Sequence, residues 1–326
     1  MNVKIGFIGC GGIANAHMGV LSKIKDVEFV GMCDVEEEKA KKASQMYGGK
    51  IYTDYHKMLD ELEMDACYIC IPPFAHKDQE LLCIEKNIPF FVEKPIHLDL
   101  EKAKEIAEKV KKKKLITCVG YQDRYQDIIS YIKPFFEKGN LGFFTGWWVG
   151  GMPGVYWWRR KEMSGGQIVE QTTHIFDMAR YLVGEPIALY ATKRVGLMKD
   201  VKGYNVEDAS AVSVYFKNGV FGTIFSGCFL KVSGKVGLDF YFSDKVIEYT
   251  ERMSVKINYG NRVEEILEDT CGILLKEDQT FIKAVKEKKP ELIKSPYEDG
   301  IKTLVFTLSA NKSLKTGKEV EIEKVL

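Results

Sequence analysis

The chain has 326 residues, of which 45% are hydrophobic, and its 47 basic side chains nearly balance its 46 acidic ones. This length favours one or two domains with sizeable cores, two being the better expectation. A net charge of +1 gives no general attraction to nucleic acid or to an anionic membrane, so we expect neither as a partner. Residues 1–9 read as a strand, not as a signal peptide, and no apolar run approaches the roughly 18 residues of a membrane helix. The expected location is therefore the cytoplasm, where eight cysteines do not indicate a disulfide framework.

A glycine-rich turn follows the first predicted strand, Val3–Ile8, and precedes a predicted helix that runs to about Lys25. It matches the pattern G-x-G-x-x-A, which is weak evidence alone but informative between a strand and a helix. The first glycine permits the tight turn, the second lets the backbone approach a pyrophosphate, and the alanine lets the helix pack closely. The residues that we expect to contact a dinucleotide here are Gly9, Gly11, Gly12, Ile13 and Ala14.

An acidic residue closes the second predicted strand, Val27–Cys33, and it lies 20 residues beyond Ala14. This residue, Asp34, is placed to accept hydrogen bonds from the ribose hydroxyls of the adenosine. Its carboxylate would repel a 2′-phosphate, and the residue after it is Val35, not an arginine. The sequence therefore predicts NAD as the cofactor in preference to NADP.

Strands and helices continue to alternate up to about residue 120, which predicts a doubly wound parallel sheet. The further strands are expected at Ala66–Ile71, Ile88–Val92 and Leu115–Val119, and the helices at Glu36–Met46, Asp54–Glu61, His76–Lys86 and Leu98–Lys112. His17, inside the first helix, is most simply a packed residue. Cys67 and Cys70 would point to opposite faces of a strand, so they do not suggest a metal or redox pair, and no metal site is expected.

The strand Ile88–Val92 stops at Glu93-Lys94-Pro95, because proline lacks a backbone donor. The carboxyl ends of parallel strands line the ligand crevice, so a lysine there is placed to meet cofactor and substrate together. On position alone, a solvated lysine that closes a strand is the simpler interpretation of Lys94. The break at Pro72-Pro73 lies at another carboxyl end, and His76 follows it.

The pattern changes after Gly120, and residues 121–326 predict a second, α+β domain. A loop, Gly150–Gly166, carries Trp157, Trp158 and Arg159. Aromatic faces beside guanidinium groups suit a sugar-like ligand and suit an oligomer interface equally well. We expect these three residues to bind substrate.

A single helix is predicted over Gln167–Val183, and its polar face carries Glu170, His174, Asp177 and Tyr181. At helical spacing the histidine has a carboxylate one turn away on either side, which would fix its tautomer and raise its pKa. The same pattern also describes a solvated polar face.

Most of Ile187–Glu268 reads as strands, including a hairpin of Asp208–Phe216 and Val220–Phe225 around Asn218-Gly219. Neither face of this hairpin is clearly polar, so both faces must be covered. Helices would cover one face and a second subunit the other, which predicts a homodimer or homotetramer through this sheet. Helices at Ile273–Lys288 and Asp299–Lys315 and a strand at Glu319–Ile322 complete the chain.

Five stretches in this order resemble the glucose–fructose oxidoreductase/inositol dehydrogenase/MocA (Gfo/Idh/MocA) family: GCGGIA, VEKP, VGYQDRY, GGQIVEQTTHIFD and SPYEDG. The resemblance covers nearly the whole chain, and the EKP and later histidine motifs carry most of its specificity. It implies a Rossmann domain over residues 1–120 and a second domain with a mixed, mostly antiparallel sheet over residues 121–326. It also implies an NAD(P)-dependent oxidoreductase that acts on sugars, cyclitols and related polyols.

The resemblance further implies that Lys94 and His174 meet at the substrate hydroxyl. Glu170 stands where the family usually has aspartate, Asp177 matches the family's second acid, and Thr172 replaces a glycine. The residues that it places near the nicotinamide are Pro72, Pro73, His76 and Glu93, and those expected near the substrate are Tyr121 and Arg124, from VGYQDRY.

The chemistry agrees with these roles, because His174 is a suitable general base and Lys94 a donor to the developing alkoxide or the base itself. Two other functions stay open: a glycoside-cleaving enzyme that retains its NAD, and a non-catalytic NAD-binding regulator.

Overall fold

The computed structural model describes residues 2–322 and divides into two compact units. Unit 1 consists of Met1–Gln122 and Cys271–Ile301, and unit 2 consists of Asp123–Thr270 and Lys302–Leu326. The sequence-based division at residue 120 therefore did not foresee that residues 271–301 return to the first unit. Within residues 2–322, no helix combines the length and apolar character that crossing a membrane requires.

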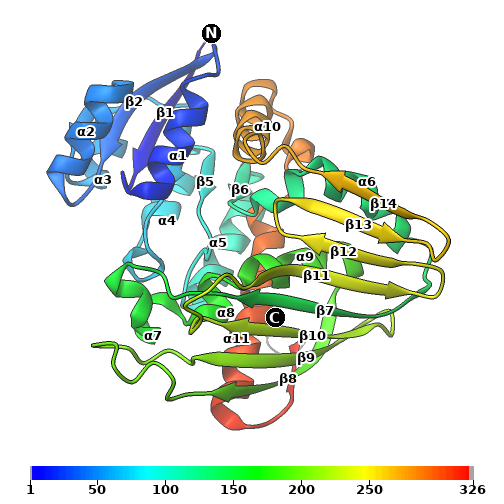
Figure 1. Cartoon of the computed structure of the whole chain (residues 1–326). Coiled ribbons are helices and arrows are strands. Elements are labelled where there is room, and N and C mark those ends of the chain that lie inside the picture. Colours follow the sequence, from blue (N-terminus) through cyan, green and yellow to red (C-terminus); the bar gives the residue numbers. More distant parts are fainter. Residues whose placement is uncertain (1, 323–326) are drawn as a thin grey trace. The chain divides into compact units, whose positions relative to one another are not determined.

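Unit 1 is built on a six-stranded parallel sheet, so the expected doubly wound architecture is confirmed (Figure 1). Its strand order, β3-β2-β1-β4-β5-β6, reverses direction between β1 and β4. Such a reversal opens a ligand crevice at the carboxyl ends of the strands. The strands are β1 (Val3–Ile8), β2 (Val27–Cys33), β3 (Lys50–Tyr52), β4 (Ala66–Ile69), β5 (Phe90–Val92) and β6 (Thr117–Val119).

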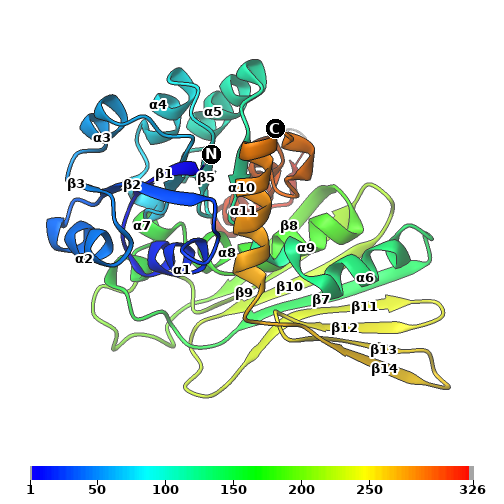
Figure 2. The same cartoon turned by 90° about the horizontal axis from the view of Figure 1, so that it is seen from above.

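Helices cover both faces of this sheet. Figure 2 shows α1 (Gly12–Leu21) and α2 (Glu37–Tyr47) on one side, and α3 (Tyr55–Glu61), α4 (Gln79–Glu85) and α5 (Leu100–Lys113) on the other. The returning helix α10 (Ile273–Glu287) packs against α1 and β1. On this side of the sheet Tyr68 stacks on Phe7 and Phe91, with ring centroids 4.8 and 4.9 Å away, and Phe281 of α10 packs edge-on against Tyr68 and Phe91. The apolar face of α10 thus completes the core of unit 1.

Unit 2 is built on a nine-stranded sheet with the order β14-β13-β12-β11-β7-β10-β9-β8-β15. Every neighbouring pair is antiparallel except β7 and β10. The expected mixed, mostly antiparallel sheet is therefore confirmed. The strands are β7 (Leu141–Val149), β8 (Pro186–Arg194), β9 (Ala209–Phe216), β10 (Phe221–Gly227), β11 (Lys235–Phe242), β12 (Val246–Thr250), β13 (Ser254–Asn258), β14 (Val263–Leu267) and β15 (Val320–Glu321).

One face of this sheet is covered by helices of unit 2 (Figure 2), namely α6 (Asp127–Phe136), α8 (Gln167–Glu170), α9 (Thr173–Val183) and the later part of α11 (Tyr297–Thr316). Phe306 of α11 packs edge-on against Phe176 of α9 and Phe216 of β9, which ties both helices to the sheet. A short helix, α7 (Lys161–Ser164), precedes α8. The opposite face of the sheet keeps large aromatic side chains exposed, among them Tyr215 and Phe221.

The single helix predicted over Gln167–Val183 is wrong, because the structure has two helices that are separated at Gln171-Thr172. The backbone N–H of Thr172 donates to the carbonyl of Gln167, five residues back, and that of Ile175 donates to Thr172, three residues back. A wide turn followed by a tight one shifts the phase of the helix. Glu170 and His174 therefore do not lie one turn apart on a common helical face.

Candidate active site

The turn between β1 and α1 has the shape that a pyrophosphate requires. Gly9 has φ of 93°, and a Cβ there would lie 2.2 Å from the carbonyl oxygen of Cys70, so only glycine fits. A Cβ on Gly11 or Gly12 would meet nothing within 4 Å, which leaves open space beside the backbone. Helix α1 begins at Gly12 without a side-chain cap, and Ala14 is fully buried. The residues present thus fit a dinucleotide phosphate at the positive end of a helix; Ile13, beside them, is exposed.

Asp34 is fixed at the carboxyl end of β2 by two backbone donors. Its Oδ2 accepts from the N–H of Cys10 at 2.8 Å, and its Oδ1 accepts from the N–H of Glu36 at 2.9 Å. The carboxylate is therefore tied to the glycine turn. Burial, with the charge of Asp34 beside it, raises the pKa of the Cys10 thiol to about 12. Cys10 accordingly stays a neutral thiol and is a buried, structural residue of the turn.

The side chain of Glu93 turns into the interior of unit 1, just after β5. Its Oε1 lies 3.0 Å from Nε2 of His17, and its Oε2 accepts from the backbone N–H of Lys94 at 3.1 Å. A Cβ on Gly120 would lie within 2.9 Å of both carboxylate oxygens, so the space around them is closed. Lys94 is half-buried, and its peptide bond to Pro95 is cis.

His17 is fully buried between two carboxylates. Its Nδ1 lies 2.9 Å from Oδ1 of Asp278 on α10, and the hydroxyl of Tyr68 donates to the same oxygen at 3.1 Å. Burial lowers the pKa of His17, but the charge and hydrogen bond of Asp278, together with Glu93, raise it by more. The net effect raises the pKa of His17 well above its ordinary value, which favours the imidazolium, the form that donates from both nitrogens.

The loop after β4 forms a short 3₁₀ turn, Pro73–Ala75, which His76 follows. Nδ1 of His76 lies 2.6 Å from Oε1 of Glu80, and both side chains are fully buried. Burial, and then the neighbouring His76, lowers the pKa of His97. The Pro72-Pro73 turn and His76 thus lie at the carboxyl end of β4. This is the end of the parallel strands at which the ligand crevice was expected.

His174 stands in the first turn of α9 in unit 2 and is 5% exposed. Its ring stacks on Trp148 of β7, with 5.7 Å between centroids. Nδ1 lies 3.6 Å from Oδ2 of Asp123, a distance for charge interaction, not for a hydrogen bond. Nε of Arg252 donates to the other oxygen of Asp123 at 2.7 Å. Asp123, unforeseen from the sequence, is therefore a carboxylate held in place beside this histidine.

Asp177 is engaged away from His174. Arg124 donates two hydrogen bonds to the carboxylate of Asp177, of 2.7 and 2.6 Å, and the hydroxyl of Thr303 donates a third at 2.7 Å. Arg124 and Asp177 are each at most 2% exposed. The expectation that Asp177 flanks His174 fails because these donors engage both of its oxygens. The Arg124–Asp177 pair joins the segment after Gly120 to α9, and Arg124, as part of this pair, has almost no surface to offer a substrate.

Trp158 is also a core residue. It is fully buried in a cluster with Val206 and Cys228, and its Nε1 donates to Oε2 of Glu170 at 2.7 Å. It therefore has no surface with which to contact a substrate, contrary to expectation. Its neighbours Trp157 and Arg159 are half-buried, whereas Tyr121 is 1% exposed. The contact of Trp158 with Glu170 instead fixes the position of that carboxylate.

Three residues near the predicted site were not assigned to it from the sequence: His17, Asp278 and Asp123. His17 and Asp278 could have been noticed in the sequence, because each is a titratable residue on the apolar face of its helix. On α1 the buried positions are Ala14, His17, Met18 and Leu21, and on α10 they include Asp278 and Phe281. No comparable signal marked Asp123.

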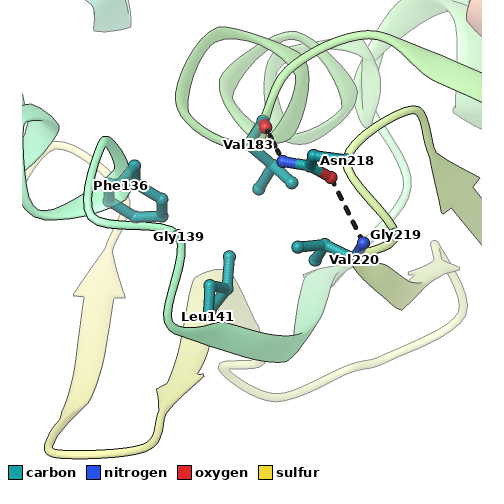
Figure 3. Close-up of a pocket in the computed structure, with 7 residues that line it drawn as sticks. All are labelled: Phe136, Gly139, Leu141, Val183, Asn218, Gly219 and Val220. Atoms are coloured by element: carbon teal, nitrogen blue, oxygen red, sulfur yellow. Dashed lines mark hydrogen bonds between the residues drawn. The ribbon is translucent and has the colours of Figure 1, made fainter.

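Unit 2 also contains a small hollow at the turn between β9 and β10 (Figure 3). Its volume is about 190 Å³, and Phe136, Leu141, Val183 and Val220 line it together with Gly139, Asn218 and Gly219. Asn218 closes one side by donating to the carbonyl of Val183 at 2.8 Å and accepting from the N–H of Val220 at 3.2 Å. It is smaller than a typical ligand pocket of about 300 Å³ or more. None of the predicted site residues lines it.

Both units match known proteins. Residues 3–121 match the oxidoreductase family with an NAD-binding Rossmann fold, GFO/IDH/MocA, and residues 138–247 match the C-terminal domain of the same family. A myo-inositol 2-dehydrogenase from Thermotoga maritima is 27% identical and aligns over 99% of this chain and all of its own length. An inositol 2-dehydrogenase from Rhizobium meliloti is 29% identical over 66% of this chain and 64% of its own.

Solved structures share the fold. An oxidoreductase from Agrobacterium radiobacter, in complex with NAD+, L-tartaric acid and magnesium, aligns over the whole of both chains with a TM-score of 0.85 at 17% identity. The family model that matches residues 3–121 is that of an NAD-binding Rossmann fold, and the six-stranded parallel sheet is formed by these residues. The chain therefore belongs to the GFO/IDH/MocA family of oxidoreductases, and NAD is the cofactor of its Rossmann unit.

Proposed function

We propose that this enzyme transfers hydride between NAD and a secondary hydroxyl of a cyclitol or sugar-like polyol, with Lys94 and His174 at the reacting hydroxyl. The main support is the position of Lys94, which follows β5 at the carboxyl ends of the strands of the NAD-binding sheet. Alignment with an inositol dehydrogenase over the whole chain supports the substrate class. Lys94 belongs to unit 1 and His174 to unit 2, so their meeting at one hydroxyl is part of the proposal.

Oxidation of a secondary alcohol breaks a C–H bond and an O–H bond, giving a ketone. NAD, when bound, supplies the acceptor for the hydride. The proton of the hydroxyl passes to a side chain of the enzyme. In the reverse direction the same groups return hydride and proton to the ketone.

His174 is the proposed proton acceptor. A proton on Nδ1, facing Asp123 at 3.6 Å, makes Nε2 the basic nitrogen of the ring. The negative charge of Asp123 also stabilises the imidazolium that forms when the proton is taken up. Lys94 donates a hydrogen bond to the alkoxide as charge develops on it, which is the interaction that a cation contributes best.

We also propose that NAD is used in preference to NADP. The carboxylate of Asp34 is fixed by the N–H groups of Cys10 and Glu36, so it cannot easily turn away from a 2′-phosphate. Its fixed negative charge would repel that phosphate and accept hydrogen bonds from the free ribose hydroxyls of NAD.

A screen with myo-inositol, scyllo-inositol, glucose and related polyols, each with NAD and with NADP, tests the proposal through the absorbance of the reduced cofactor. Net accumulation of NADH is expected. A glucoside is added to the same screen, and its consumption without net NADH would favour the glycoside-cleaving alternative.

Replacing Lys94 tests its role. Lys94→Met should lower kcat by about 10²- to 10³-fold, the usual cost of removing one stabilising donor, while NADH binding, followed by fluorescence, changes little. Lys111→Met, in the last turn of α5, is the control for loss of a lysine and should match the parent enzyme. Lost NADH binding with unchanged turnover per bound cofactor would refute the role given to Lys94.

A further inference from the structure

His17 connects three segments that are distant in the sequence. It lies on α1, its Nε2 contacts Glu93 after β5, 76 residues away, and its Nδ1 contacts Asp278 on α10, 261 residues away. All three side chains are buried, and His17 and Asp278 are fully so. The imidazole ring also packs edge-on against Phe91, with 4.8 Å between centroids. The ring therefore has one orientation in which both nitrogens meet a carboxylate.

The contact with Glu93 reaches the backbone of Lys94. Of the two carboxylate oxygens, Oε1 faces His17 and Oε2 accepts the N–H of Lys94. The backbone N–H of Glu93 donates to the carbonyl of Ile69 on β4 at 2.9 Å, which fixes the start of the segment. The close approach of Gly120 removes the space into which the carboxylate would otherwise turn.

We propose that His17 is a positioning residue for Lys94. It fixes the Glu93 carboxylate, and that carboxylate accepts a hydrogen bond from the backbone N–H of Lys94. The position of the backbone of Lys94, from which its side chain extends, therefore depends on His17. This inference rests on the proposed function, in which Lys94 meets the reacting hydroxyl. His17 itself touches neither substrate nor cofactor in this scheme. Asp278 keeps the ring turned toward Glu93 and supplies the second acceptor.

The charge state of the cluster agrees with this role. The pKa of His17 lies well above its ordinary value, because the two carboxylates together outweigh the effect of burial. An imidazolium donates from both nitrogens at once, which a neutral imidazole cannot do. Hydrogen bonds between charged partners are the stronger kind and hold their geometry more firmly.

Each ring nitrogen of His17 contacts a different carboxylate, so two amide variants can test the two contacts separately. In His17→Gln the amide nitrogen takes the place of Nε2 and keeps a donor toward Glu93. In His17→Asn it takes the place of Nδ1 and keeps a donor toward Asp278 only. Both are made together with Asp278→Asn, so that loss of the imidazolium is matched by loss of one carboxylate and the cluster keeps its net charge of −1.

The test measures kcat, KM and NADH binding, with myo-inositol as the first alcohol. The Asn variant is expected to lose about 10- to 100-fold in kcat, the order of effect that a misplacement near 1 Å produces. The Gln variant is expected to stay within about threefold of the Asp278→Asn parent, because its Glu93 contact survives. KM and NADH affinity should change little in either.

Equal turnover of the two amide variants would overturn the inference, since the Glu93 contact would then make no difference. Asp278→Asn alone provides a second check if the double variants fold poorly. It keeps the contact between His17 and Glu93 and should retain kcat. A loss of about tenfold or more in kcat for Asp278→Asn alone would show that the docking of α10 governs turnover, which also overturns the inference. Lys94→Met in the same assay distinguishes failure of this inference from failure of the proposed function. An active Lys94→Met enzyme would refute the proposed function itself.

Discussion

Glu93 and Glu170 are carboxylates that take their positions from ring nitrogens. Glu93 lies 3.0 Å from Nε2 of His17, and Glu170 accepts from Nε1 of Trp158 at 2.7 Å. Hydrogen bonds that involve a charged group are worth more than neutral ones, and a buried carboxylate that loses its donor is costly. Each ring therefore fixes a carboxylate of the proposed site, although neither ring is expected to meet the substrate.

Replacing Trp158 with phenylalanine removes the donor to Glu170 and keeps an aromatic ring in the buried cluster. We expect kcat/KM to fall by about 5- to 50-fold, corresponding to the roughly 1–2 kcal/mol cost of an unsatisfied charged group. Tyr204→Phe is the matched control, because Tyr204 packs on the same cluster but its hydroxyl donates to the carbonyl of Glu207. Unchanged kcat/KM for Trp158→Phe, beside a loss for Glu170→Gln, would show that Glu170 does not depend on the indole.

The raised pKa of His17 makes the stability of the protein depend on pH. The groups that face its ring are Asp278 of α10 and Glu93 after β5, with Tyr68 of β4 bonded to Asp278. Because the pKa is raised on folding, the stabilisation is complete below about pH 6.5, the unfolded value, and is lost as pH rises through the folded pKa. The urea midpoint of the parent should therefore approach that of His17→Gln/Asp278→Asn as the pH rises above about 6.5. A gap that stays constant over this range would mean that His17 is neutral in the folded protein.

Local structure that depends on neighbours along the chain was predictable, and contacts with distant partners were not. Asp34 and Gly9 follow from a strand, a turn and a helix in sequence. His17 could be placed on a buried helix face, but its acceptors come from 76 and 261 residues away. Asp177 was expected beside His174 from spacing alone, whereas Arg124, 53 residues away, engages it.

The turn from β1 into α1 is the element proposed to bind the cofactor, and its first glycine has no room for a side chain. Gly9→Ala should weaken NADH binding by at least about tenfold, because a Cβ 2.2 Å from the Cys70 carbonyl forces the loop to move. Gly139→Ala is the control: Gly139 also has positive φ, 70°, but a Cβ there meets nothing within 4 Å. It should cost about 1–2 kcal/mol of stability and leave NADH binding unchanged. Equal NADH affinities for the two variants, measured by fluorescence, would contradict this account.

Elements with strong local signals were predicted closely. The strands β1 and β2 have the bounds expected from their apolar runs. The division of Gln167–Val183 into α8 and α9 was missed because apolar periodicity persists across a single wide turn, which only the backbone hydrogen bonds of Thr172 and Ile175 reveal. The helix α10 was predicted as an element, but its docking in unit 1 depends on packing against Tyr68 and Phe91. Periodicity carries no information about such a partner.

For the whole molecule, the uncovered face of the nine-stranded sheet predicts self-association. Four aromatic side chains lie on four neighbouring strands: Tyr241 of β11, Phe143 of β7, Phe221 of β10 and Tyr215 of β9. Phe143 stacks on Tyr241 at 4.5 Å and on Phe221 at 5.8 Å, and Phe221 pairs with Tyr215 across the strands. Tyr215 and Phe221 are 53% and 51% exposed. A contiguous exposed aromatic row of this kind is typical of an interface.

We therefore propose a homodimer or homotetramer through this face. Light scattering at about micromolar concentration, where a stable interface stays formed, should give a multiple of the 37.1 kDa chain mass. Phe221→Glu should shift the mass toward the monomer, because a charge in the centre of the row would be buried without a partner. Met46→Glu, at a more exposed apolar position on α2 of unit 1, should leave the mass unchanged. A parent protein that is monomeric under these conditions would rule out the interface, and the exposed aromatic row would then need another partner.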